Sequence, residues 1–376
     1  QTPQSLEEAL AAELHPEDNG AAELMKIYPG SIAEQMIDST DAWLPSLPFQ
    51  FPPLTLEKIH AYVARHQAKL DRGRVALRMP SWKYFWQPTA GYLADVHFVE
   101  CTRVAARLEL LSAAVDLADH DLDGAAEHLA FALEFAARLG QANHVYARRI
   151  AAQLREETFA GVAALGASPM VQPDHLNAIR RTLADHIAAW PADADAWIAD
   201  RACGMHQYEL IRDGQFLSTL PHEDYQRMRD EKELEPTVRA VVRNLNADEI
   251  FYLQQMQAII ASCQVPFYQR AETLSQLSLQ LAALEPTNDY PLVAGNWLLT
   301  DVAQQHRIAA RDRALAIAWN LAFELAAGGA PPAPPQINPL TGAPFDLQVE
   351  PQRISVAAID VGPNDTPIVL PRWTKP

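Results

Sequence analysis

The sequence predicts an all-α protein that ends in a small β-hairpin. From residue 54 to residue 327, apolar residues recur at the three- and four-residue spacing of amphipathic helices. This pattern breaks at Gly, Pro, Asp and Asn positions, where helices commonly stop and start. Runs of strand-forming residues are almost absent before residue 328. We therefore expect one long helical region, followed by a short segment of a different kind.

The first 53 residues form a separate N-terminal segment, which we call the arm. Short helical patterns at residues 5–14 and 20–28 are followed by the stretch "LPSLPFQFPP", whose prolines prevent a single continuous helix. The arm is nevertheless rich in large apolar side chains, among them Trp43, Phe49 and Phe51. We expect the arm to bury these side chains against the helical region or against another polypeptide.

The helical region, residues 54–327, divides into a series of helices. They are expected at residues 54–72, 91–119, 123–139, 141–166, 173–189, 193–213, 222–232, 235–243, 246–263, 266–284 and 289–327. The stretch "ARLELLSAAVDLADHDLDGAAEHLAFALEFAARLG" has the small residues and polar turn of a tetratricopeptide hairpin, although the repeat period of such arrays does not recur. Leu129, Leu133 and Ala136 should face the helix that ends near Ala118.

The turn of this hairpin begins like the calcium-binding loop of an EF-hand. Asp119, Asp121, Asp123 and Gly124 match the first, third, fifth and sixth positions of that loop. The twelfth position requires a bidentate Glu, but here it is Ala130. Helical spacing also resumes directly after the glycine. We therefore favour an inter-helical turn with Asp123 as the helix N-cap, and keep Ca²⁺ binding by the three aspartates as the alternative.

The final segment, residues 328–376, begins with the Pro-rich linker "GGAPPAPP". Residues 345–349 and 354–361 favour strands, and the proline between them falls in the turn, which predicts a β-hairpin. An extended tail with the apolar sequence "IVLPRW" follows and includes Trp373. This tail, like the arm, should dock on a surface.

An aromatic cluster lies between the first two long helical patterns. Trp82, Tyr84 and Trp86 belong to the stretch "SWKYFWQP" and lie near basic residues. Such residues suit a protein-docking or sugar-stacking surface, because aromatic rings supply large rigid contact areas. The interpretation we favour is that they fill the junction between the arm and the long helices. The candidate interaction residues are Trp43, Phe49, Phe51, Trp82, Tyr84, Trp86 and Trp373.

Composition and charge restrict the function. The chain is 49% hydrophobic and 20% charged, an ordinary composition for a globular protein. Its net charge of −17 repels nucleic acid, so we expect no nucleic-acid partner. No apolar run approaches the roughly 18 to 20 residues that span a bilayer. Because the chain begins with Gln1 rather than Met, we expect a processed, exported protein in the periplasm, the cell envelope or the medium.

Motifs of the common active sites are missing from the sequence. It contains no H-E-x-x-H, G-x-S-x-G, G-x-x-x-x-G-K-[ST] or G-x-G-x-x-G. Cys101, Cys203 and Cys263 form no C-x-x-C pair and allow at most one disulfide. We therefore assign no catalytic or cofactor-binding residue. Two carboxylates that are distant in sequence, as glycoside hydrolases use, remain an open alternative.

Four further stretches occur in a distinctive order. They are "HPEDNGAAELMKIY", "ALRMPSWKYFWQPTAGYLADVHFVECTRVAARLELLSAA", "DLDGAAEHLAFALEFAARLG" and "ALAIAWNLAFELAAGGAPPAPPQINPLTGAPFDLQVEPQRISVAAIDVGPND". In this order they resemble a group of uncharacterised exported helical proteins of planctomycete-type bacteria. The last stretch is also similar to the C-terminal part of type II secretion pseudopilins, whose final loop can hold calcium. The resemblance adds Asp360 and Asp365 as Ca²⁺ candidates, although "TPIVLPRWTKP" replaces the usual acidic, glycine-rich ending.

These observations lead us to expect an exported, non-catalytic helical scaffold or interaction protein. It would be a subunit of a cell-envelope or extracellular assembly, with protein partners or self-association. The alternatives are a carbohydrate-active or other hydrolytic enzyme with dispersed carboxylates, and a periplasmic ligand-binding accessory protein. A deep pocket with convergent acids beside exposed tryptophans would favour the enzyme.

Overall fold

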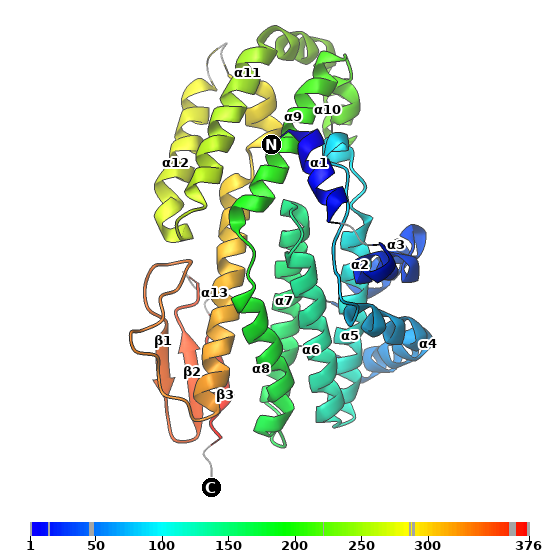
Figure 1. The fold of residues 1–376 in the computed structure, drawn as a ribbon, viewed down its shortest axis with the longest axis vertical. Helices are drawn as coiled ribbons and strands as arrows, with labels where there is room; N and C mark the ends of the chain where they lie inside the picture. The colour runs from blue at the N-terminus through cyan, green and yellow to red at the C-terminus, as the bar shows by residue number, and fades with distance from the viewer. Residues whose placement is uncertain are drawn as a thin grey trace.

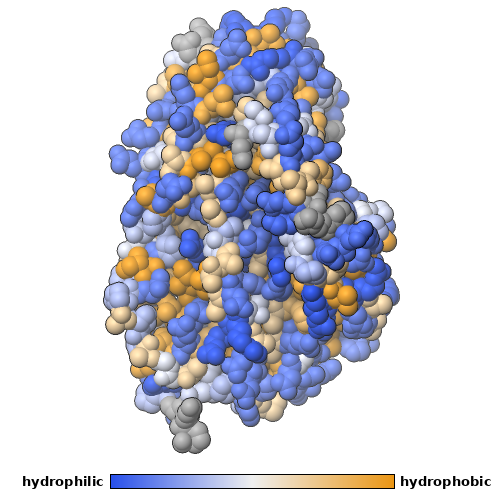
Figure 2. All heavy atoms as spheres, viewed as in Figure 1, coloured by the Kyte–Doolittle hydropathy of each residue, from blue (hydrophilic) through white to orange (hydrophobic). Residues whose placement is uncertain are grey.

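The computed structural model describes residues 2–13, 16–44, 49–220, 222–285, 287, 290–360 and 366–373. Helices make up most of the protein, and a small antiparallel sheet lies at its C-terminal end (Figure 1), so the predicted fold class is confirmed. Within the described residues, no helix has the length and apolarity that a membrane span requires. On the face shown in Figure 2, hydrophobic residues lie in small groups among hydrophilic ones.

The arm forms three short helices, α1 (Pro3–Ala12), α2 (Gly20–Ile27) and α3 (Gly30–Asp41). Helix α2 packs on α4 (Pro53–Leu77) and α5 (His97–Ala118), and α3 packs on α5. Helix α1 packs instead on the turn η2 (Pro88–Leu93) and on α9 (Asp193–Arg212). The arm's large apolar side chains are buried in the cores of the helical region; they include Leu6, Leu24, Ile27, Tyr28, Leu44 and Phe49. The arm is therefore part of the protein's own interior.

The helical region forms two groups of helices along the long axis of the molecule (Figure 1). The lower group contains, besides α4 and α5, the helices α6 (Leu122–Gly140), α7 (Val145–Gly166) and α8 (Pro173–Ala188). The upper group contains α9 (Asp193–Arg212), α10 (His222–Asp230), α11 (Leu234–Ser262) and α12 (Phe267–Leu284). The long helix α13 (Val302–Ala326) packs on α12 and also on α7 and α8, so it connects the two groups.

Several predicted helix boundaries are wrong; the helix expected at residues 54–72, for example, continues to Leu77. The helix expected from residue 91 begins at His97, because η2 (Pro88–Leu93) is a 3₁₀ turn in which Gly91 has φ 58°. The two helices expected at residues 235–243 and 246–263 are the single helix α11. The helix expected from residue 289 is interrupted by the π-helical turn η4 (Ala294–Leu298).

Asp248 explains why α11 is continuous and why the chain turns at η4. An aspartate after two asparagines is typical of a helix start, but Asp248 lies inside α11 and its carboxylate does not cap that helix. Instead it accepts the backbone N–H groups of Val293 and Ala294, at 2.8 and 3.0 Å, and the Tyr208 hydroxyl at 2.6 Å. Asp248 thus caps a different segment, which is 45 residues away in sequence.

The C-terminal sheet has three antiparallel strands in the order β1 (Asp346–Val349), β2 (Arg353–Ala357) and β3 (Ile368–Pro371). The first two strands form the predicted hairpin. The third strand comes from the tail, and pairs Leu370 with Ile354. The sheet packs on α13, and β3 also packs on α7, where a Cβ at Gly166 would lie 2.6 Å from Leu370 Cδ2. The tail therefore docks on the protein's own helices.

One buried and one partly exposed ion pair connect α7 to α13. Arg155 Nε lies 2.8 Å from Asp312 Oδ1 on α13, and both side chains are buried. The next residue, Glu156, forms a bidentate pair with Arg311 of α13, with two contacts of 2.9 Å.

Replacing Leu133 of α6 with Ala should destabilise the protein by roughly 2 to 5 kcal/mol, because the leucine is fully buried between α5 and α6 and leaves a cavity. Urea denaturation measures this change. Leu279→Ala on α12 is the matched control, since Leu279 is 61% exposed. Equal small losses in the two variants would contradict the packing of the hairpin.

Replacing Asp312 with Ala should cost about 3 to 5 kcal/mol of unfolding free energy, because it leaves the buried Arg155 without its carboxylate. The double variant Arg155→Leu, Asp312→Leu should recover much of this loss, since it removes both charges. Urea denaturation of the three proteins tests the pair, and a single variant as stable as the wild type would refute it.

Candidate functional site

A groove of about 620 Å³ lies between an extended segment and the C-terminal ends of α6 and α8. We call it the aromatic groove. It is lined by Leu10, Glu13, Pro80, Ser81, Trp82, Lys83, Tyr84, Trp86, Glu134, Ala137, Arg138, Gln141, Ala142, Asn143, Asp185, His186 and Ala189. The groove therefore brings together three of the seven interaction residues expected from the sequence, Trp82, Tyr84 and Trp86.

The extended segment, residues 81–87, has the alternating burial of a β-strand. Trp82, Tyr84 and Trp86 are buried, whereas Lys83 and Gln87 are exposed. The stretch "SWKYFWQP" is therefore built like a strand, with aromatic side chains on one face. This segment forms one wall of the groove.

The three aromatic rings fix this wall to the arm and to the long helices. The Trp82 ring meets Gly20 of α2, where an added Cβ would come within 2.5 Å of it. Tyr84 stacks on Phe98 of α5 with ring centroids 4.5 Å apart. Trp86 packs edge-on against His144 at 4.9 Å. The cluster fills the junction between the arm and the helices, and it also shapes the groove.

The opposite wall is polar and comes from α6 and α8. Glu134 Oε2 lies 2.8 Å from His186 Nε2, and Glu134 Oε1 lies 2.8 Å from Arg138 Nε. Burial acts to raise the pKa of Glu134, but the hydrogen bond and charge of His186 and the charge of Arg138 outweigh it and lower the pKa below its ordinary value. Glu134 is therefore ionised at neutral pH and is a poor general acid.

The aspartates of the α5–α6 turn are arranged as a helix cap. Asp121, not Asp123, is the N-cap of α6, and its carboxylate accepts the Gly124 N–H at 2.9 Å. The predicted cap at Asp123 is therefore wrong by two residues, because α6 starts earlier than its apolar spacing indicates. The Asp123 side chain is 88% exposed, with one carboxylate oxygen 3.6 Å from His175 Nε2. Asp119 follows directly on α5 as its C-cap.

The other expected calcium ligands are Asp360 and Asp365. Asp360 follows β2 and precedes β3, and it forms ion pairs with two arginines of α13: 2.8 Å to Arg307 and 3.0 Å to Arg311. Its carboxylate thus attaches the C-terminal segment to α13. Asp365 lies outside the described residues. Across the part of the chain that the structure describes, no group of three or more His, Cys, Asp or Glu side chains is placed to hold a metal ion.

The remaining interaction candidates lie in the protein's own cores, away from the residues that line the groove. Trp43 packs edge-on against Tyr62 at 5.1 Å, and Phe49 against Phe51 at 5.6 Å. Trp373 is half-buried against the main core, and its backbone N–H donates to the Ala326 carbonyl at 2.9 Å.

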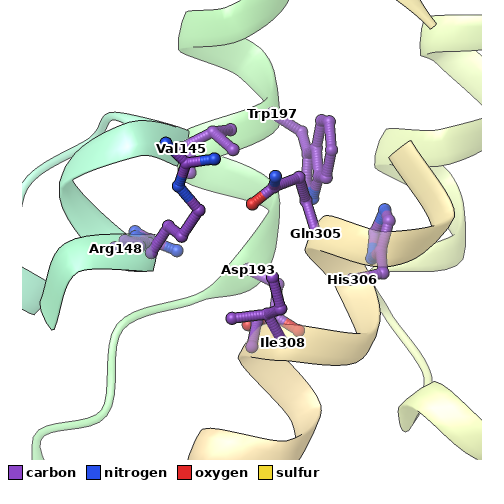
Figure 3. Close-up of a pocket in the computed structure, with 10 residues that line it drawn as sticks. Val145, Arg148, Asp193, Trp197, Gln305, His306 and Ile308 are labelled. Atoms are coloured by element: carbon purple, nitrogen blue, oxygen red, sulfur yellow. The ribbon is translucent and has the colours of Figure 1, made fainter. Parts of the chain in front are cut away.

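A second, smaller hollow of about 30 Å³ lies between α7, α9 and α13 (Figure 3). Asp193, Trp197, Gln305 and His306 are among its lining residues. His306 is buried and stacks on Trp197 with ring centroids 4.5 Å apart, while its Nδ1 lies 3.1 Å from a nitrogen of Arg270. Burial, together with the charge of Arg270, lowers the pKa of His306 to about 4. This volume is about that of one water molecule.

Sequence reasoning missed the polar wall of the groove and the His306 hollow. Glu134 and His186 are 52 residues apart, and no motif connects them. The only available signal was the alternation in "SWKYFWQP", which marks one wall but not the other.

The three cysteines are free thiols in the structure. Comparison of the chain with protein-family models, with curated proteins and with solved structures finds no match.

Acidification should weaken the protein through His306. Because its folded pKa of about 4 lies below the ordinary value near 6.5, the unfolded chain binds the proton more readily, and stability falls as the pH drops from about 6.5 towards 4. Between about pH 7.5 and pH 5 this side chain should account for a loss of about 2 kcal/mol. Urea denaturation at both pH values measures the effect. His306→Gln should lose this part of the pH dependence, whereas His60→Gln at an exposed site should keep it.

Proposed function

We propose that the protein is a non-catalytic helical interaction protein that binds its partner in the aromatic groove. The observation that carries this proposal is the groove itself, about 620 Å³ in volume. An extended segment that is anchored by buried aromatic rings faces a wall of charged and amide side chains across it. Hollows of this size that combine apolar surface with a few placed polar groups are the usual binding sites of proteins.

Both walls of the groove are held in place without a ligand. The extended wall is fixed by its buried rings, and the polar wall by the Glu134 ion pairs with His186 and Arg138. A preformed site loses little conformational entropy when it binds. This rigidity supports a binding role.

The enzyme alternative has less support. The groove does gather Glu13, Glu134 and Asp185, but the tryptophans beside them are only 8% and 2% exposed and offer little ring surface for stacking on a sugar. Glu134 also has a lowered pKa, whereas the acid of a glycoside hydrolase needs a raised one. The resemblance in sequence further leads us to propose that the protein acts as a subunit of an exported assembly.

Photocrosslinking tests the groove as the binding surface. Benzoylphenylalanine at Gln141, an exposed residue of the groove, should give a crosslinked product of discrete mass in the cells that naturally make the protein. The same group at Gln67, an exposed glutamine of α4 that is not part of the groove, is the matched control. Mass spectrometry identifies the products. Equal products at both positions, or none at either, would refute the proposal.

A further inference from the structure

We propose that the aromatic groove binds an extended, basic polypeptide segment, which adds as a β-strand to residues 82–86. This inference rests on the proposed function and specifies its partner. Strand addition needs an extended segment with unpaired backbone groups on an accessible edge, and pockets that receive alternate side chains.

One edge of the extended segment is already paired. The Ser81 N–H donates to the Asp18 carbonyl at 3.2 Å, and the Ser81 carbonyl accepts the Gly20 N–H at 2.9 Å. Two residues later, Lys83 is paired by the Asn19 side chain. The Asn19 amide oxygen accepts the Lys83 N–H at 3.0 Å, and the Asn19 amide nitrogen donates to the Lys83 carbonyl at 2.7 Å. Residues 81 and 83 therefore direct both of their backbone groups towards the arm.

The other edge is unpaired. In an extended chain the N–H and C=O of one residue point to the same side, and successive residues point to opposite sides. Trp82, Tyr84 and Trp86 therefore direct their backbone groups away from the arm. Across the described residues, these three make no backbone hydrogen bond, and all three line the groove. Trp82 and Tyr84 remain 8% and 9% exposed and Trp86 only 2%, so the first two offer the backbone groups with which an incoming strand would pair.

The groove offers room for one strand along this edge. Ala137, Ala142 and Ala189 supply small side chains on the facing elements. Residues 82–86 extend over roughly 13 to 17 Å, at about 3.3 Å per residue, so a segment of about five residues would pair with them.

Charge selects the partner. The protein carries a net charge of −17, which attracts a basic segment and repels an acidic one. Two acids of the groove already have cationic partners: Glu13 pairs with Lys83 at 2.6 Å, and Glu134 pairs with Arg138 and His186. Asp185 is exposed and, among the described residues, forms no ion pair. A Lys or Arg of the segment would meet the Asp185 carboxylate while its backbone pairs with residues 82–86.

Fluorescence anisotropy with the full chain tests this inference. The probe is a fluorescein-labelled peptide of about seven residues in which Lys and Val alternate, and it should bind. The same peptide with every backbone nitrogen methylated keeps its charge but loses its donors, so it should bind at least about tenfold more weakly. A peptide of alternating Glu and Val should also bind at least about tenfold more weakly.

A variant pair locates the binding site. Ala189→Trp fills the groove and should weaken binding of the Lys–Val peptide by at least about tenfold. Ala167→Trp is the matched control, because Ala167 is an exposed helix C-cap on α7 just as Ala189 is on α8, but does not line the groove. Circular dichroism confirms that both variants are folded.

The inference is overturned if no peptide binds, if the methylated or the acidic peptide binds as tightly as the Lys–Val peptide, or if the two tryptophan variants bind equally. Failure of the peptide experiment combined with a discrete crosslink at Gln141 would refute strand addition and leave the proposed function standing. Failure of both experiments would remove both proposals.

Discussion

Three consecutive charged residues on α7 constrain the whole structure. Successive residues of a helix point about 100° apart, so Arg155, Glu156 and Glu157 face different neighbours. Arg155 and Glu156 pair with Asp312 and Arg311 of α13, and Glu157 pairs with Arg107 of α5 at 2.7 Å. An unpaired charge in the interior costs several kcal/mol. Alternative packings of α5, α7 and α13 would separate these pairs, so they specify one register.

The same network reaches both ends of the chain and the groove. Arg107 also pairs with Asp41 at the end of α3, and Arg311 with Asp360 between β2 and β3. The partners of the α7 charges therefore also hold the arm and the C-terminal segment. Arg155 donates to the Ala136 carbonyl near the C-terminal end of α6 and lies over the Trp190 ring at 4.9 Å, directly after α8. It therefore contacts α6 and the segment that directly follows α8.

Local patterns in the sequence were sufficient to predict the helices and the hairpin, because helix periodicity and turn residues depend on residues only a few positions apart. Interactions between residues far apart in the sequence could not be predicted from such local patterns. Arg155 and Asp312 are 157 residues apart, and Asp248 caps a segment that its own neighbourhood does not reveal. The third strand was missed for the same reason, since "IVLP" becomes a strand only beside β2. In the candidate site, the aromatic wall was visible in the sequence, but its partners on α6 and α8 were not.

The extended wall is unusual because it is a strand without a sheet. Its stability comes from buried rings and from the Asn19 side chain, which imitates a neighbouring strand on one edge only. The other edge contributes no backbone hydrogen bond among the described residues. Residues 82–86 are already extended and fixed, and therefore the conformational entropy of binding would be lost mainly by the incoming segment. The buried charges of α7 keep the facing wall in place, so the interactions that stabilise the fold also preorganise the groove.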